Sequence, residues 1–81
     1  MSDIRIQKQI RDATKQLMAI SAHAKNNEIS IDRTNLKIEL MSNFSITTKV
    51  AEELIDLVFN KKSFDLQDDL FTPINTVKKD E

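Results

Sequence analysis

Four basic side chains recur at helical spacing near the start of the chain, and side chains of this kind bind phosphate. Arg5, Lys8, Arg11 and Lys15 lie three or four residues apart. On an α-helix this spacing puts all four on one face, where they could follow a phosphate backbone. The alternative is an ordinary solvated face, which Asp12 would interrupt. Both interpretations remain open from the sequence.

The other ionisable side chains do not form a pattern typical of catalysis or metal binding. His23 is the single histidine, and a partly buried or helix-dipole-stabilised imidazole is expected there. Asp65, Asp68 and Asp69 lack the central glycine of a calcium loop, so a solvated turn is expected. The acids of residues 52–56 lack the apolar setting that a proton-transfer pair needs. The sequence therefore predicts no enzyme, no metal and no cofactor.

Size and composition favour one small globular domain. The chain has 81 residues, of which 40% are hydrophobic and 31% charged, and it has no cysteine and no glycine. Without glycine the phosphate-cradling loops of nucleotide-binding proteins are excluded. No apolar run could span a membrane and no signal core opens the chain, so a cytoplasmic protein is expected. The net charge of −1 predicts no general affinity for nucleic acid, although the chain runs from a basic start to an acidic end.

Residues 3–25 are predicted to form a first helix that ends at Asn26-Asn27, because asparagine tolerates the left-handed conformation. Met18 and Ile4 lie off the apolar stripe of this helix, on a side that is otherwise polar. The stripe itself recurs at steps of three and four residues and contains Ile6, Ile10, Ala13, Leu17, Ile20 and Ala24.

The middle of the chain predicts a short strand over residues 28–31 and then a second helix capped by Asp32. This helix would carry Leu36, Leu40, Met41 and Phe44. The alternation of Leu36, Ile38 and Leu40 leaves a hairpin of residues 29–31 with 36–40 as the alternative.

Residues 42–46 are predicted to form a break, with Thr47 or Ser45 capping a third helix. Alternating segments follow on both sides of the turn Asp68-Asp69, and Pro73 is expected to restrict the second of them to an edge strand. The domain is expected to cover residues 1–74, followed by a flexible tail over residues 75–81. The expected buried face of the third helix consists of Val50, Leu54, Leu57 and Val58, with Ala51 and Ile55 at its margin.

This order of elements resembles the winged helix-turn-helix superfamily over residues 28–72. The resemblance implies a mainly α, α+β fold, a small winged helix-turn-helix with three helices and a minor β-hairpin. It also implies that Thr47, Thr48, Lys49 and Glu52 face the major groove of DNA. A simple helical bundle is the alternative. The positions that carry the resemblance are Leu36, Leu40 and Phe44 on the supporting helix and Ile46, Val50, Leu54 and Leu57 on the recognition helix.

The expected function is that of a small protein that binds double-stranded DNA, as a transcriptional regulator or a genome-maintenance factor. Because its net charge gives a monomer little positive surface, a homodimer is expected. Met18 and Ile4 are apolar residues on an otherwise polar side of the first helix, so the dimer is expected to be built mainly on that helix. The alternative is an adaptor or small inhibitor that binds a basic protein partner through its acidic face and does not bind DNA. The expected DNA contacts are Thr47, Thr48, Lys49, Glu52, Lys61 and Lys62, with Arg11 and Lys15 supporting them.

Overall fold

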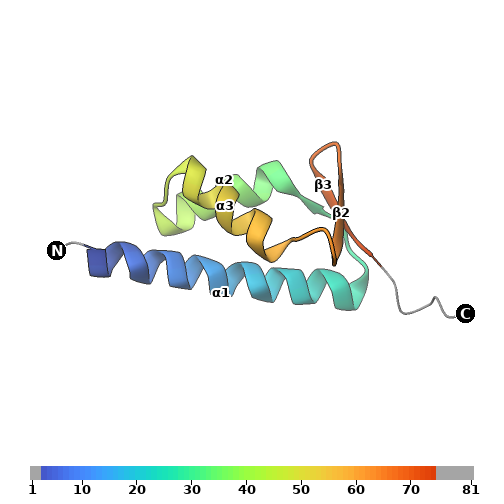
Figure 1. Cartoon of the computed structure of the whole chain (residues 1–81), viewed down its shortest axis with the longest axis horizontal. Helices are drawn as coiled ribbons and strands as arrows, with labels where there is room; N and C mark the ends of the chain where they lie inside the picture. Colours follow the sequence, from blue (N-terminus) through green and yellow to red (C-terminus); the bar gives the residue numbers. More distant parts are fainter. Residues whose placement is uncertain (1–2, 75–81) are drawn as a thin grey trace, which may run out of the picture.

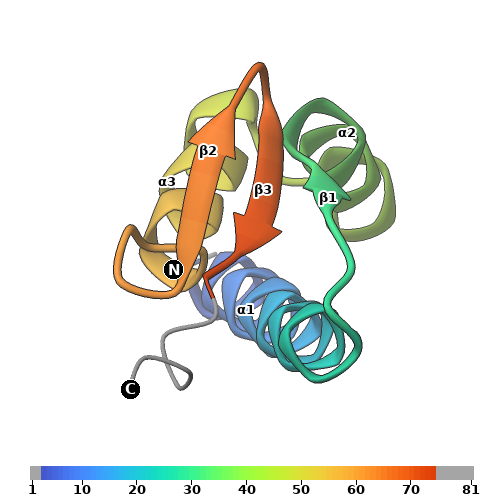
Figure 2. The same cartoon turned by 90° about the vertical axis from the view of Figure 1, so that its right-hand side faces the viewer.

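A computed structural model describes residues 3–74 as three helices and a three-stranded antiparallel sheet. The helices pack around a common core, with α1 running beneath α2 and α3, and the sheet closes one end of this group (Figures 1 and 2). The predicted class, a small α+β fold with three helices and a minor sheet, is confirmed. The expected tail, residues 75–81, lies outside the described residues. The elements are α1 Asp3–Asn27, β1 Ile31–Asp32, α2 Arg33–Phe44, α3 Thr48–Val58, β2 Phe64–Gln67 and β3 Leu70–Pro73.

The side chains of α1 that are buried in the core lie in the later part of the helix. Ala13, Leu17 and Ala24 are fully buried, whereas Ile6 remains 50% exposed and Ile4 78% exposed. Ile6 was expected in the buried stripe, but it lies at the α2–α3 turn, which covers only one side of it. Ile10 packs against the core but stays partly exposed, and the first fully buried side chain described in α1 is that of Ala13.

The end of α1 is formed by Glu28 rather than by an asparagine in the left-handed conformation. Glu28 has a φ of 53°, and the Ile29 N–H donates to the Ala24 carbonyl at 2.9 Å. This six-to-one bond is typical of a helix end at which glycine is preferred, but the chain has no glycine. The predicted left-handed asparagine is wrong. Asn27 contributes through its side chain, which donates to the His23 carbonyl at 2.9 Å.

The second helix is a helix and not the alternative hairpin. The Asp32 carboxylate accepts from the backbone N–H groups of Thr34 and Asn35 at 2.9 and 3.2 Å, which confirms the predicted cap. The preceding strand β1 is shorter than expected and begins only at Ile31, because Glu28 forms the end of α1.

The break between α2 and α3 is also shorter than expected. Helix α2 continues to Phe44, and Ser45 then adopts a left-handed φ of 55°. Thr47 caps α3 by accepting from the Val50 N–H at 3.2 Å. Three residues therefore join the two helices, and the Thr47 cap fixes where α3 begins.

Helix α3 is rotated relative to the predicted buried face. Ala51 and Ile55, expected at its margin, are fully buried, whereas Leu57 is 68% exposed. Leu54 is buried as expected, and Val58 is half-buried. The prediction for Leu57 is wrong because α3 packs against both α1 and α2, and Ala51 and Ile55 are the residues that this packing buries fully.

The sheet places β3 between β1 and β2. Pro73 was expected to restrict its strand to an edge, and this is wrong. Strand β1 pairs only with Leu70 and Phe71, so it never reaches Pro73, which pairs with Phe64 on β2 at the end of the strand. The missing N–H of Pro73 therefore interrupts no pairing with β1. The rings of Phe59, Phe64 and Phe71 pack together beneath this sheet, with centroids 4.6 to 6.2 Å apart.

Candidate nucleic-acid interface

The start of α3 brings three of the predicted contacts together. Thr47, Thr48 and Lys49 follow one another in the first turn, and all three are exposed. The Thr47 hydroxyl is the helix cap, and the Thr48 hydroxyl donates to the Met41 sulfur at 3.4 Å. Lys49 forms no ion pair with any described residue. Its ammonium is therefore the group at this helix start that is available to an external anion.

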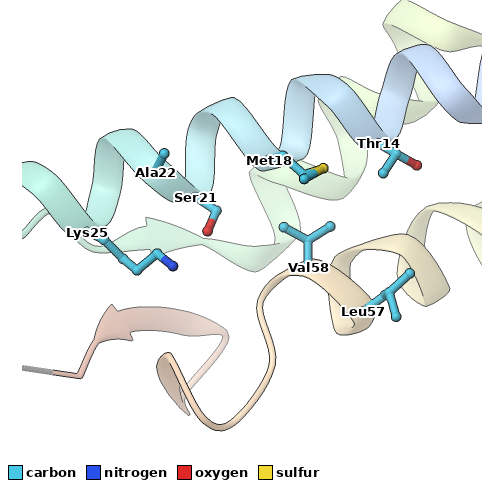
Figure 3. A pocket seen from close by; sticks show the side chains of 7 residues that line it. All are labelled: Thr14, Met18, Ser21, Ala22, Lys25, Leu57 and Val58. Atoms are coloured by element: carbon cyan, nitrogen blue, oxygen red, sulfur yellow. The ribbon is translucent and has the colours of Figure 1, made fainter. Parts of the chain in front are cut away.

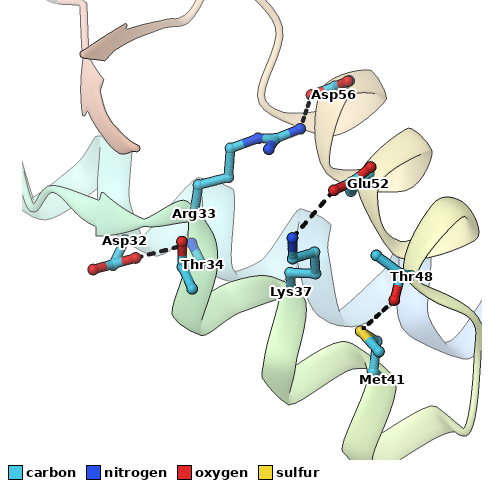
Figure 4. A network of polar contacts seen from close by, with 8 residues as sticks. All are labelled: Asp32, Arg33, Thr34, Lys37, Met41, Thr48, Glu52 and Asp56. Atoms are coloured by element: carbon cyan, nitrogen blue, oxygen red, sulfur yellow. Dashed lines mark hydrogen bonds and ion pairs between the residues drawn. The ribbon is translucent and has the colours of Figure 1, made fainter. Parts of the chain in front are cut away.

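Glu52, the fourth predicted contact on α3, is held by α2. Its carboxylate lies 3.1 Å from the Lys37 ammonium, and one turn later the Asp56 carboxylate lies 3.1 Å from the Arg33 guanidinium (Figure 4). These two ion pairs bridge the faces of α2 and α3 that lie next to each other. The acids therefore face cations of the same molecule, a pairing that has no local signal in the sequence.

The two ion pairs change the electrostatic character of α3. Glu52, Glu53 and Asp56 are its acids, and Lys49 is its single cation. With Arg33 and Lys37 of α2 counted, three cations stand against three acids, so this surface is neutral. The acidic face expected from the sequence is therefore largely compensated.

The remaining predicted contacts lie on other parts of the molecule. Lys61 and Lys62 are exposed and follow the end of α3, where the Asn60 side chain accepts from the Lys62 N–H at 3.0 Å. Arg11 and Lys15 are exposed on α1, which is a separate helix. The predicted site residues thus form a group at the start of α3, a pair of lysines beyond its end, and a separate pair on α1.

The tip of the β2–β3 hairpin is acidic. Asp68 and Asp69 both have positive φ, 51° and 64°, and they form the two-residue turn that was predicted. The Arg33 N–H donates to the Asp69 carbonyl at 2.7 Å and ties the turn to the start of α2. With Asp65 nearby on β2, this tip would repel phosphate.

A groove between α1 and α3 was not found by sequence reasoning. It has a volume of about 420 Å³, and Met18 and Leu57 lie on its opposite sides with 58% and 68% exposure (Figure 3). Lys25 of α1 also lines it. Met18 was expected to be exposed and Leu57 was expected to be buried. The groove could not be predicted, because it depends on the rotation of α3 that exposes Leu57.

Two further expectations concern metal and histidine chemistry. Within residues 3–74, no group of three or more histidine, aspartate or glutamate side chains is placed to hold a metal ion. His23 is exposed, and its Nδ1 lies 3.2 Å from the Asn27 amide nitrogen at the end of α1. This contact makes His23 part of a helix end.

Among the helices of residues 3–74, none combines the length and the apolar character that crossing a bilayer requires. Comparisons of the chain with protein-family models, with curated proteins and with solved structures found no match.

Proposed function

We propose that the chain binds double-stranded DNA with the start of α3 in the major groove, as a small transcriptional regulator or genome-maintenance factor. The observation that supports this best is the Lys49 ammonium at an exposed helix start, which pairs with no acid of residues 3–74 and lies beside acids that α2 already compensates. An α-helix fits the width of the major groove. The positive end of the α3 dipole adds to the attraction for phosphate.

The spacing of the lysines along α3 suits the two walls of a groove. Helix α3 has 11 residues and is therefore roughly 16 Å long. Lys49 lies near its start, and Lys61 and Lys62 follow its end, so these cations cannot share one phosphate. A major groove about 12 Å wide lies between two phosphate backbones, and the two ends of α3 would each approach one of them.

Binding by a single copy would be weak and strongly dependent on salt. Each phosphate contact contributes about 0.9 to the slope of log affinity against log salt concentration. The α3 region offers Lys49, Lys61 and Lys62, and the acidic hairpin tip opposes them. A homodimer on the DNA would double the number of contacts and would occupy two half-sites about one helical turn apart.

The two copies would meet on the DNA and not through α1. The exposed face of α1 carries Lys8, Arg11 and Lys15. A symmetric contact of α1 with its copy would bring these like charges together, and this repulsion opposes association.

The alternative function, an adaptor that binds a basic partner through the acidic face of α3, receives less support. Such a partner would have to displace Arg33 from Asp56 and Lys37 from Glu52 before it gained either carboxylate. Only Glu53 on α3 is outside these ion pairs.

The deciding experiment measures the fluorescence anisotropy of a labelled duplex of random sequence during protein titration at low salt. We expect Lys49→Ala to weaken binding and to lower the salt slope by about 1. Lys25→Ala removes the same charge at the far end of α1 and serves as the matched control, with no expected effect. If the wild-type protein does not bind at low salt, or if the two variants behave alike, the proposal is wrong.

A further inference from the structure

The exposed side of α1 carries a continuous stripe of residues that the DNA proposal does not use. Its members recur at alternating steps of four and three residues, which keeps them on one face of a helix. All are exposed. We call this the α1 stripe, and it consists of Ile4, Lys8, Arg11, Lys15, Met18, Ala22 and Lys25.

The charges of the α1 stripe have no partner within the described molecule. Lys8, Arg11 and Lys15 are neighbours at steps of three and four, so they repel one another. Neither these three residues nor Lys25 forms an ion pair with a described residue. Residues 4–27 hold five basic side chains against Asp12 alone, a net charge of +4, whereas residues 28–74 hold five basic and nine acidic side chains, a net charge of −4. The positive charge is therefore concentrated on α1.

The apolar members of the α1 stripe lie where a partner's anchors could bind. Met18 opens onto the groove of about 420 Å³ whose other side is Leu57 (Figure 3). Ile4 is 78% exposed and lies 14 residues earlier, which is roughly 21 Å along the helix. A flexible methionine beside an exposed leucine accepts aliphatic or aromatic side chains of different shapes.

We propose that the α1 stripe and Leu57 form a docking surface for an acidic amphipathic helix of a partner protein. One apolar side chain of that helix would enter the groove between Met18 and Leu57, and a second would cover Ile4. Its glutamates or aspartates between these anchors would pair with Lys8, Arg11 and Lys15. Binding of this kind uses apolar anchors at helical spacing and complementary charge around them.

Three other occupants fit the same observations less well. Nucleic acid would pair with the cations but would leave Met18 and Leu57 in water. A membrane surface requires a broad apolar helix face, but the apolar face of α1 is buried in the core. A second copy placed helix to helix would bring like charges together.

The test uses a synthetic probe: a fluorescein-labelled helical peptide of about 21 residues, with two leucines 14 positions apart on one face and glutamates between them. A matched peptide carries glutamine in place of every glutamate. We expect anisotropy to report binding of the glutamate peptide to the full chain and at least about tenfold weaker binding of the glutamine peptide.

Variants of the protein then locate the contact. Leu57→Ser and Lys15→Glu should each weaken binding of the glutamate peptide about tenfold, whereas Leu57→Met should preserve it. Lys49→Ala, which tests DNA binding, should leave peptide binding unchanged, so the two proposals fail separately. Circular dichroism confirms that each variant is folded.

Several outcomes overturn the docking proposal. Equal affinity for the two peptides would show that charge is not recognised, and an unchanged affinity of Leu57→Ser would show that the groove is not used. A third outcome concerns the occupant. If the glutamate peptide does not bind, but duplex DNA or vesicles of anionic phospholipid bind the chain and lose that binding on Lys15→Glu, the α1 stripe binds nucleic acid or lipid and the docking proposal is wrong.

Discussion

The Lys37 ammonium of α2 lies 3.1 Å from the Glu52 carboxylate of α3, although 15 residues separate them in sequence. Both side chains are only partly exposed, 26% and 40%. The pair lies between the two helices of the proposed helix-turn-helix. It therefore reduces the negative charge that α3 presents to a ligand.

Breaking this pair from the cationic side should weaken DNA binding. Lys37→Met leaves Glu52 uncompensated beside the proposed phosphate contacts, and we expect a loss of about fivefold or less, because a partly exposed ion pair is worth about 1 kcal/mol at most. Adding Glu52→Gln should restore the affinity. If the double variant binds as weakly as Lys37→Met alone, Lys37 itself contacts DNA, and the compensation argument is wrong.

Asp32 should contribute to stability as the cap of α2. Asp32→Ala leaves the N–H groups of Thr34 and Asn35 without their acceptor, and we expect a loss of about 1 kcal/mol in the free energy of unfolding. Asp32→Asn retains an oxygen acceptor and should lose only a few tenths of this. Urea denaturation followed by circular dichroism measures both, and equal losses for the two variants would contradict a capping role.

The hairpin tip should accept a more favourable turn. Asp68 and Asp69 both have positive φ, and Asn-Gly is the preferred pair for two such residues. Asp68→Asn combined with Asp69→Gly should raise the free energy of unfolding by roughly 0.5 to 1 kcal/mol. The matched control, Asn at both positions, removes the same charge without introducing glycine. A control as stable as the Asn-Gly variant would attribute the gain to charge and not to backbone conformation.

The rotation of α3 predicts that truncating two of its apolar side chains lowers the free energy of unfolding by different amounts. Ile55 is fully buried, so Ile55→Val should cost about 0.5 to 1.5 kcal/mol. Leu57 is 68% exposed, so Leu57→Ala should stay within about 0.5 kcal/mol of the wild type. Thermal and urea unfolding would both show the contrast. A larger loss for Leu57→Ala than for Ile55→Val would restore the face expected from the sequence.

The features that could be predicted from sequence are those with a local cause. The Asp32 cap, the helix over residues 36–40 and the Asp68-Asp69 turn each depend on side chains within a few residues of one another. Propensity and spacing express such causes directly. The possible cap at Thr47 was recognised for the same reason.

The features that could not be predicted depend on distant contacts. The apolar residues of α3 span roughly 160° of the helix circumference, with Ile55 at one edge of this arc and Leu57 at the other, so spacing alone cannot decide which of the two faces inward. The central position of β3 requires Ile31 to pair with Phe71, 40 residues away. The ion pair of Lys37 with Glu52 has no local signal either, and the candidate interface is neutral only because of contacts of this kind.

The exposed start of α1 has a consequence for amide hydrogen exchange. Residues 4–8 are all exposed, and the first fully buried side chain is that of Ala13. Helical turns with few buried tertiary contacts open easily, since a short helix is marginal by itself in water. The amides of Gln7 and Lys8 should therefore exchange far faster than that of Leu17 within the same helix. A docked helical partner that covers Ile4 would slow this exchange from the free end inward, so the protection gradient along α1 would itself report occupancy.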